Sequence, residues 1–542
     1  MLTGFNPQAI NDLEGARQAI GALLNLVEEL KQENQRLREE IQRQRDEINR
    51  LKGEEGQPEI KGKKPAQNHS SEKERQVAKP WQKGSKQAKL QIDREEKLRL
   101  ERSSLPADAE FKGYKAVVIQ DISIHSANVR FLKEHYYSVG EQKSYLADLP
   151  AGYSGQFGPG LRALVPSCYF AFGMTEPKIS EFLTQFGIEI SPGQLSNLLI
   201  KDKEAWHAEK AAIVRAGIAS TDYQHMDDTA TRVNGENQHC HVLCNPLYSA
   251  YFTYPAKDRL TVIQILQGAA EVQLLLTSQT QEWLDLFNLP HKVQQKIAGW
   301  PQHSLITRSA LEQQIDEQLP TLNSQQKARI LEAAALTAYY EQTTMPIVTI
   351  LQTDDAPQFQ QVTQLQNLCW IHDGRHYKKL TPFVDFHRQL LDAFLKRYWD
   401  FYHQLLAYRQ APDPNQAHAL RLSFVALFTT VTGYAELDNR IAKTLAKKDK
   451  LLLVLTYPQL LLHNNPAELA ARQRVRKRDI SFGPRTDDGR QAWDTFMTLF
   501  ETAKKLDVNF FDYLYDRISG SSSMISLADL ISQRAFASTP NY

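Results

Sequence analysis

The chain has 542 residues, which is too long for one ordinary domain core and predicts several domains. Hydrophobic residues make up 42% and charged residues 23%, a balance that excludes a wholly disordered or fibrous chain. The 64 Lys and Arg against 63 Asp and Glu give a net charge of +1, so overall charge indicates no partner.

Cysteine content and hydropathy indicate the cellular environment. Four cysteines are too few for a disulfide framework, which predicts a reducing compartment. The N-terminus has no basic start followed by an apolar run, so no secretory signal is expected. The most apolar stretch, residues 451–462, contains Pro458 and is too short to span a bilayer. We therefore expect a soluble, cytoplasmic protein without membrane contact.

A heptad repeat dominates the first fifty residues. Its a positions are Ile20, Val27, Asn34, Ile41 and Ile48, and its d positions are Leu23, Leu30, Leu37, Gln44 and Leu51. β-Branched residues at a with leucine at d favour two parallel strands, and Asn34 in the seam would fix their register. We predict that residues 1–53 form a coiled coil that makes the chain a homodimer or a higher homo-oligomer. The alternative is one amphipathic helix docked on its own domain.

A basic, polar segment follows at residues 54–105. Positions 61–89 carry nine Lys or Arg, including Lys61, Lys63 and Lys64, against two Glu, which gives a local charge of +7. So few apolar residues cannot bury enough surface to fold alone. Two interpretations stay open: a solvated linker, and an arm that binds DNA phosphates.

The next segments predict a small β-module and a pair of helices. Apolar and polar residues alternate over 114–124 and 128–138, so residues 106–155 are expected to form short strands. Within 156–205, one helix is expected to end at Gly187 and a second to begin after Ser191. This arrangement indicates a helix-turn-helix, although any pair of packed helices has a similar sequence pattern. The side chains expected to contact bases are Gln194, Ser196 and Asn197.

An α/β domain is expected at residues 206–480. Three strands and a helix are predicted over 223–268, a helical insertion over 269–343, and a further strand over 347–355. Long helices follow, one of them around 465–477, and residues 481–542 are expected to be a helical C-terminal segment and tail.

A zinc site is not expected in this domain. His239, Cys240, His241 and Cys244 resemble zinc ligands, but strand alternation points the histidines away from the cysteines. No second cysteine pair completes a tetrahedron.

Several motifs resemble, in the same order, those of the insertion sequence 66 family of transposases. HMDDTATRV at 225–233 resembles its first catalytic strand. ILQTDDAPQF at 350–359 and LCWIHDGRHYKKL at 368–380 resemble its second aspartate strand and its Cys-Trp-x-His-x-x-Arg motif. HNNPAELAARQRVRKRDISFG at 463–483, the most specific match, resembles the Asn-Asn-x-x-Glu helix. WDTFMTLFETAKKLDVNFFDYL at 493–514 resembles the closing helix, whereas the family's cysteine-bearing zinc element has no counterpart in the predicted β-module.

The resemblance implies a ribonuclease-H-like fold with Asp227, Asp354 and Glu468 as catalytic residues that bind two Mg²⁺ or Mn²⁺ ions. Phosphodiester transfer needs an activated attacking oxygen and a neutralised leaving oxygen, which two ions supply, and such hard cations prefer carboxylate ligands. Adjacent strand residues face opposite ways, so Asp228 and Asp355 are expected to be solvated or to cap helices.

Further residues around these acids are expected to assist. His372 and Arg375 follow the second aspartate strand, and Asn464 and Asn465 are expected to cap the helix that carries the glutamate. Arg472 either contacts the scissile phosphate or forms an ion pair within its helix. The basic run expected to contact the DNA backbone comprises Arg474, Arg476, Lys477 and Arg478.

The features together predict a DNA transposase that binds the terminal repeats of its mobile element and cleaves and joins DNA strands. The expected partners are double-stranded DNA, further copies of the chain and, where the reaction needs them, accessory proteins. Two alternatives stay open: a non-catalytic DNA-binding relative, and a ribonuclease-H-like nuclease that does not join strands.

Overall fold

The computed structural model describes residues 12–51, 92–101, 105–106, 108–122, 124–153 and 155–538. A five-stranded sheet organises the chain, with the strand order β5-β4-β3-β8-β9. The strands are β3 (Tyr223–Val233), β4 (Glu236–Cys244), β5 (Ser249–Tyr254), β8 (Ile350–Thr353) and β9 (Leu365–Leu368). β3, β4 and β5 are antiparallel, whereas β8 lies parallel to β3, and β9 lies parallel to β8.

The turn between β3 and β4 explains the first hairpin. Asn234 and Gly235 have φ angles of 49° and 80°, and Val233 pairs with Glu236 across this two-residue loop. Two consecutive positive φ angles match the right-handed twist of a hairpin, and Asn-Gly adopts them most readily. The three strands and the helix predicted over 223–268 are confirmed.

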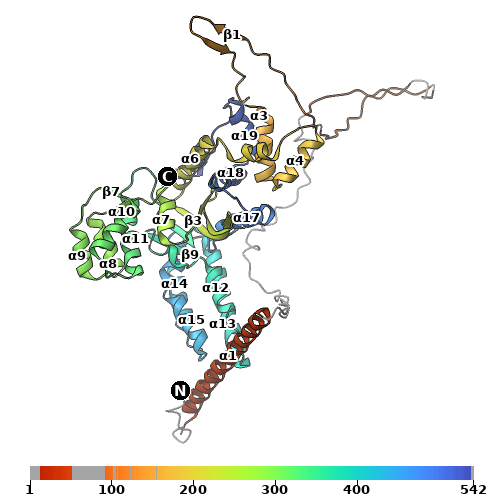
Figure 1. The fold of residues 1–542 in the computed structure, drawn as a ribbon. Coiled ribbons are helices and arrows are strands. Elements are labelled where there is room, and N and C mark those ends of the chain that lie inside the picture. The colour runs from red at the N-terminus through yellow and green to blue at the C-terminus, as the bar shows by residue number, and fades with distance from the viewer. Residues whose placement is uncertain are drawn as a thin grey trace.

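Helices surround the sheet (Figure 1). They are α6 (Glu204–Ala219), α7 (Arg259–Gln267), α17 (Asn465–Ser481), α18 (Asp487–Lys505), α19 (Phe510–Ser519) and α20 (Leu527–Ser538). α19 packs on α3 (Pro159–Pro166), and α20 packs on α6. α17 contacts β3 and β4, and α18 contacts β5, where the Thr253 hydroxyl donates to Asp494 Oδ1 at 2.7 Å. Their buried residues belong to one continuous core that includes the sheet.

The predicted insertion is helical and forms a separate lobe in Figure 1. It contains α8 (Ser278–Leu286), α9 (His291–Ala298), α10 (Arg308–Gln318) and α11 (Ser324–Glu341), with the short strands β6 (Leu274–Leu275) and β7 (Leu305–Ile306). A second lobe has its own aromatic core around Trp370. Its helices are α12 (Trp370–Lys378), α13 (Asp385–Gln410), α14 (Pro414–Phe428), α15 (Ala435–Leu445) and α16 (Lys448–Leu451).

The predicted β-module differs from expectation. The described part of 106–155 contains only the hairpin of β1 (His135–Ser138) and β2 (Lys143–Leu146), which projects from the body in Figure 1. The segment 114–124 forms no strand in its described residues, and Val117 and Ile119 are exposed. Alternation alone did not produce strands there because no surface covers the apolar face.

The expected helix pair forms close to its predicted bounds. After α3 (Pro159–Pro166), α4 (Glu176–Gln185) ends before Gly187, whose φ is +68°, and α5 (Pro192–Ile200) follows. Ser191 and Gln194 form a capping box at the start of α5.

The N-terminal helix α1 (Leu13–Leu51) confirms the predicted helix, and it docks by a polar edge rather than by its heptad seam. Glu28, only 2% exposed, accepts the backbone N–H groups of Phe383 at 2.7 Å and Val384 at 2.9 Å. The seam hydrophobics are exposed; Leu30, for example, is 55% exposed. The docking alternative therefore holds for one edge of α1, and the described residues of this chain leave the seam uncovered.

The expectation of a mixed α/β chain with an N-terminal helix and a helical C-terminus is confirmed. Within the described part of the chain, we find no helix with the length and apolar character needed to cross a membrane.

Candidate active site

The first two candidate acids lie at the same edge of the central strand pair. β3 pairs in parallel with β8, and His225 lies opposite Gln352. Asp227 lies two residues beyond this pair in β3, and Asp354 directly follows the last residue of β8. The charge of Asp354 acts on Asp227, which places the two aspartates close together at this end of the strands.

The third acid comes from the first turn of α17, which is fixed to the same strands. Asn464 is fully buried, and its Nδ2 donates to the Met226 carbonyl at 2.7 Å. Its Oδ1 lies 3.0 Å from Nδ1 of His225, which must therefore carry the proton. Four residues later, Glu468 donates its backbone N–H to the Asn464 carbonyl at 3.1 Å. The helix start is thus bonded to the strand that carries Asp227.

A second contact holds the chain just before α17. Gln352 in β8 is buried, and its Nε2 donates to the carbonyls of Leu461 and His463, both at 2.7 Å. Sequence reasoning missed this residue. The only available signal was a polar side chain in an otherwise apolar strand.

Asn464 also requires a correction. It occupies the N-cap position of α17, but its side chain makes no capping hydrogen bond there. The amide is instead committed to β3, so its role is to join the helix to the strand.

Electrostatic coupling connects the three acids. The pKa of Asp227 is raised to about 7, mainly by burial and in part by the charges of Asp354 and Glu468, against a backbone hydrogen bond from Asp228 that lowers it. The charges of Asp354 and Glu468 are therefore close enough to repel an ionised Asp227, and a cation among the three would relieve the repulsion.

His372 and Arg375, which were expected to assist the site, lie beside the glutamate. Glu468 Oε1 is 3.6 Å from Nδ1 of His372, and Oε2 is 3.6 Å from a guanidinium nitrogen of Arg375. Arg375 also lies 3.0 Å from Nε2 of His372. Burial lowers the pKa of His372, which favours the neutral ring. Oε1 of Glu468 is buried and has no hydrogen-bond partner within the described residues.

The donor set suits a hard divalent cation. Cys369, His372 and Glu468 each offer a ligand atom within 4.8 Å of the others. However, burial raises the pKa of Cys369 to about 12, so its sulfur stays a thiol and accepts the Asn464 backbone N–H at 3.4 Å. The donors left in this group are the neutral ring of His372 and the Glu468 carboxylate, whose Oε1 has no hydrogen-bond partner among the described residues. Carboxylate oxygens are the ligands that Mg²⁺ and Mn²⁺ prefer, and imidazole is compatible with Mn²⁺.

The second aspartate of each pair has its own partners. Asp228 accepts a hydrogen bond from Gln358 Nε2 at 2.8 Å and lies 3.7 Å from Nζ of Lys257. Asp355 forms an ion pair with Lys447. These two acids are thus neutralised by neighbours instead of being free or capping helices.

The prediction that Arg474 and Lys477 contact DNA is wrong. Arg474 is fully buried, 3.3 Å from Asp494 Oδ1 and 2.9 Å from the Thr253 hydroxyl. Lys477 is 5% exposed and donates to the Tyr169 carbonyl at 2.5 Å, with its ammonium over that residue's ring. Both cations hold α17 against its neighbours and cannot reach a phosphate.

Two other basic residues of α17 are exposed. Arg472 and Arg476 follow Glu468 by one and two turns, and each faces solvent. Among the described residues, Arg472 forms no ion pair with Glu468. The Glu468 carboxylate faces His372 and Arg375 instead. Arg478 is half-buried and donates to the Ala230 carbonyl at 2.7 Å.

The residues expected to bind DNA elsewhere have different environments. Gln194 is engaged in the capping box and donates to Gln156 at 2.9 Å, and Ser196 hydrogen-bonds to Glu176. Asn197 is exposed. Three further candidates lie outside the described residues: Lys61, Lys63 and Lys64.

Comparison with known proteins identifies the family. A model described as "Transposase IS66 family" matches residues 154–278 and 337–492, more than half of the chain. Most of the helical insertion lies between these two blocks. The "Uncharacterized protein y4jO" of Sinorhizobium fredii (strain NBRC 101917 / NGR234) is 29% identical over 324 residues, which cover 60% of this chain and all of that protein. No solved structure matches the chain significantly. The resemblance drawn from the motifs is confirmed, and the chain belongs to the IS66 family of transposases.

Proposed function

We propose that this protein is a DNA transposase that binds the ends of its mobile element and performs metal-dependent strand cleavage and strand transfer. The observation that supports this most is the meeting of Asp227, Asp354 and Glu468 from three distant parts of the chain. A merely structural role would not need two further carboxylates whose charges act on the buried Asp227.

These three carboxylates would hold two Mg²⁺ or Mn²⁺ ions. When bound, such ions activate the attacking hydroxyl or water and neutralise the leaving oxygen. The chain orients the carboxylates. Asn464 and Gln352 fix the start of α17, which holds the glutamate in one position relative to the aspartates. Arg375, half-exposed beside Glu468, is available to a DNA phosphate at the same place.

The sheet supports a ribonuclease-H-like core. Its strand order is β5-β4-β3-β8-β9, in which β3, β4 and β5 pair antiparallel and β8 and β9 continue the sheet in parallel with β3. We infer that DNA lies along α17, because Arg472 and Arg476 extend a basic edge from the acids. The pair α4–α5, with Asn197 exposed, is proposed as a helix-turn-helix, and the basic segment 61–89 as a phosphate-binding arm.

A second copy of the chain is proposed as the partner of α1. Its heptad seam is exposed, whereas Asn25 and Glu28 are already bonded to the body of the same chain. An exposed stripe of this length is costly unless a like helix covers it.

The test compares strand nicking with DNA binding. In Mg²⁺, Asp227→Asn should lose nicking of element-end DNA and still shift that DNA in a gel, because a neutral amide is a poor ligand for hard cations. Asp228→Asn is the matched control and should keep nicking. Unchanged nicking by Asp227→Asn, Asp354→Asn and Glu468→Gln would refute the proposal. Strand transfer with pre-cut ends separates a transposase from a nuclease that does not join strands.

A further inference from the structure

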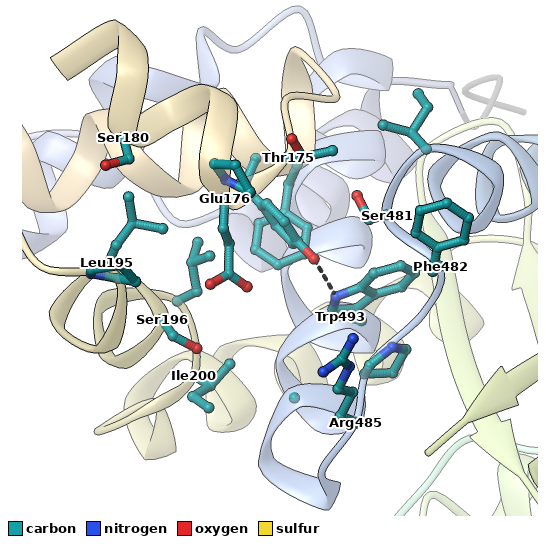
Figure 2. Close-up of a pocket in the computed structure, with 18 of the residues that line it drawn as sticks. Thr175, Glu176, Ser180, Leu195, Ser196, Ile200, Ser481, Phe482, Arg485 and Trp493 are labelled. Carbon is teal, nitrogen blue, oxygen red and sulfur yellow. Dashed lines mark hydrogen bonds between the residues drawn. The ribbon is translucent and has the colours of Figure 1, made fainter. Parts of the chain in front are cut away.

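A cleft separates the helix pair α4–α5 from the turn between α17 and α18. Its volume is about 1200 Å³, above the roughly 300–1,000 Å³ of small-molecule pockets. Glu176 and Ser196 line it from the helix pair, and Trp493, Arg485 and Phe482 line it from the opposite side (Figure 2). A cleft of this size and openness suits a segment of a polymer better than a metabolite.

Phe482 has an unusual conformation at the rim of this cleft. It follows the last residue of α17 with φ +59°, a left-handed conformation in which glycine is the ordinary residue, and it is 87% exposed. A bulky residue in this region is a genuine outlier, and such strain persists where the side chain has a role. An exposed ring adds nothing to the core, so the strain is not offset by burial.

The turn that carries Phe482 is rigid. The Phe482 N–H donates to the Arg478 carbonyl at 2.7 Å, and the Asn234 N–H donates to the Pro484 carbonyl at 3.0 Å. Gly483 lies against the β3–β4 hairpin, where an added Cβ would be 2.6 Å from the Arg232 carbonyl oxygen. The aromatic ring is therefore presented to solvent on a fixed support.

The polar groups of the cleft favour a base over a phosphate. Glu176 is half-buried inside it, and its carboxylate repels phosphate but accepts hydrogen bonds from exocyclic amino groups. The ammonium of Lys477 is committed to Tyr169. Arg485 is exposed and lines the cleft, where a phosphate beside an inserted base would meet it.

We propose that this cleft receives an unpaired nucleobase of the bound DNA, with Phe482 as its stacking platform. The inference rests on the proposed function, since it requires DNA along α17. Fourteen residues separate Glu468 from Phe482, or roughly 21 Å of helix, which is about six base steps. Arg472 and Arg476 lie between them, so a strand leaving the catalytic acids would follow a basic edge to the cleft.

The test uses a duplex of arbitrary sequence that carries one unpaired 2-aminopurine, whose fluorescence falls when it stacks. The wild-type protein should quench this probe. Phe482→Ala should abolish most of the quenching and weaken binding of the probe roughly tenfold, with unchanged affinity for the fully paired duplex. Phe482→Trp should keep the quenching. Phe536→Ala removes another exposed ring, 83% exposed in α20, and should behave as wild type.

Two results would overturn the inference. Equal quenching by wild type and Phe482→Ala would mean that no base stacks there. Binding of the probe without quenching by the wild type would leave the cleft to a protein segment. Asp227→Asn, which should lose nicking, should quench normally, so the failure of this inference is distinguishable from the failure of the catalytic proposal.

Discussion

Asn464→Ala tests whether the junction between α17 and β3 supports the catalytic acids. The substitution removes two buried hydrogen bonds and leaves the Met226 carbonyl and Nδ1 of His225 without partners. Each unsatisfied buried group costs about 1–3 kcal/mol, so we expect a loss of roughly 2–4 kcal/mol in the free energy of unfolding. Because the amide also orients the helix that carries Glu468, we expect Mn²⁺ affinity to fall roughly 10–100-fold.

Asn245→Ala is the matched control for this prediction. Asn245 is also fully buried, and its Nδ2 donates to the Gly217 carbonyl and to the Ser220 hydroxyl, both at 2.8 Å, but it has no contact with the acids. It should lose similar stability and keep wild-type Mn²⁺ affinity. Urea denaturation measures the first quantity, and calorimetric titration of the folded variants with Mn²⁺ measures the second. Equal Mn²⁺ affinity in both variants would refute the positioning role of Asn464.

Three further predictions follow from the electrostatics and from α1. Folding raises the pKa of Asp227 from 3.8 to about 7, so the folded, metal-free protein keeps a proton that the unfolded chain loses, and its stability should fall between about pH 4 and pH 7. Asp227→Asn should flatten this slope in thermal melts with EDTA, and an identical slope would contradict the assigned pKa. Replacing Leu30 and Leu37 with Glu should dissociate the oligomer in light scattering, whereas an unchanged mass would exclude the seam as the interface. Glu28→Ala should cost about 0.5–2 kcal/mol by removing the acceptor for the Val384 N–H at the start of α13, and an unchanged denaturation midpoint would show that the docking adds no stability.

The parts of the fold that the sequence predicted are those in which local pattern and tertiary contact agree. The strand over 223–233 combines alternation with an Asn234-Gly235 turn, and helix α17 packs on it and covers its apolar side chains. The segment 114–124 has a similar alternation and forms no strand in its described residues. Period-two alternation shows which side chains a strand would bury. It does not show whether another part of the protein is present to cover those side chains.

The candidate site was predictable only as far as its motifs. Composition and spacing could not select Asp227, Asp354 and Glu468 from 63 acidic residues, and the family resemblance supplied that choice. The contacts that position the acids could not be found in this way, so sequence reasoning assigned Asn464 a capping role and missed Gln352. Both act through contacts with segments more than a hundred residues away, and no local pattern encodes such contacts.

Helix α17 shows why a charge run is a poor guide to a nucleic-acid surface. Arg472 and Arg476 are four residues apart and share the exposed face that continues from Glu468. Arg474 and Lys477 are three residues apart and occupy the opposite, buried face. There Arg474 pairs with the Asp494 carboxylate, and both cations lie over aromatic rings. Only the helical period separates the two pairs. If DNA lies on the exposed face, Arg472→Ala and Arg476→Ala should weaken DNA binding and reduce the salt dependence of the affinity. Arg474→Ala should instead destabilise the fold, because it leaves the buried Asp494 charge without its cation.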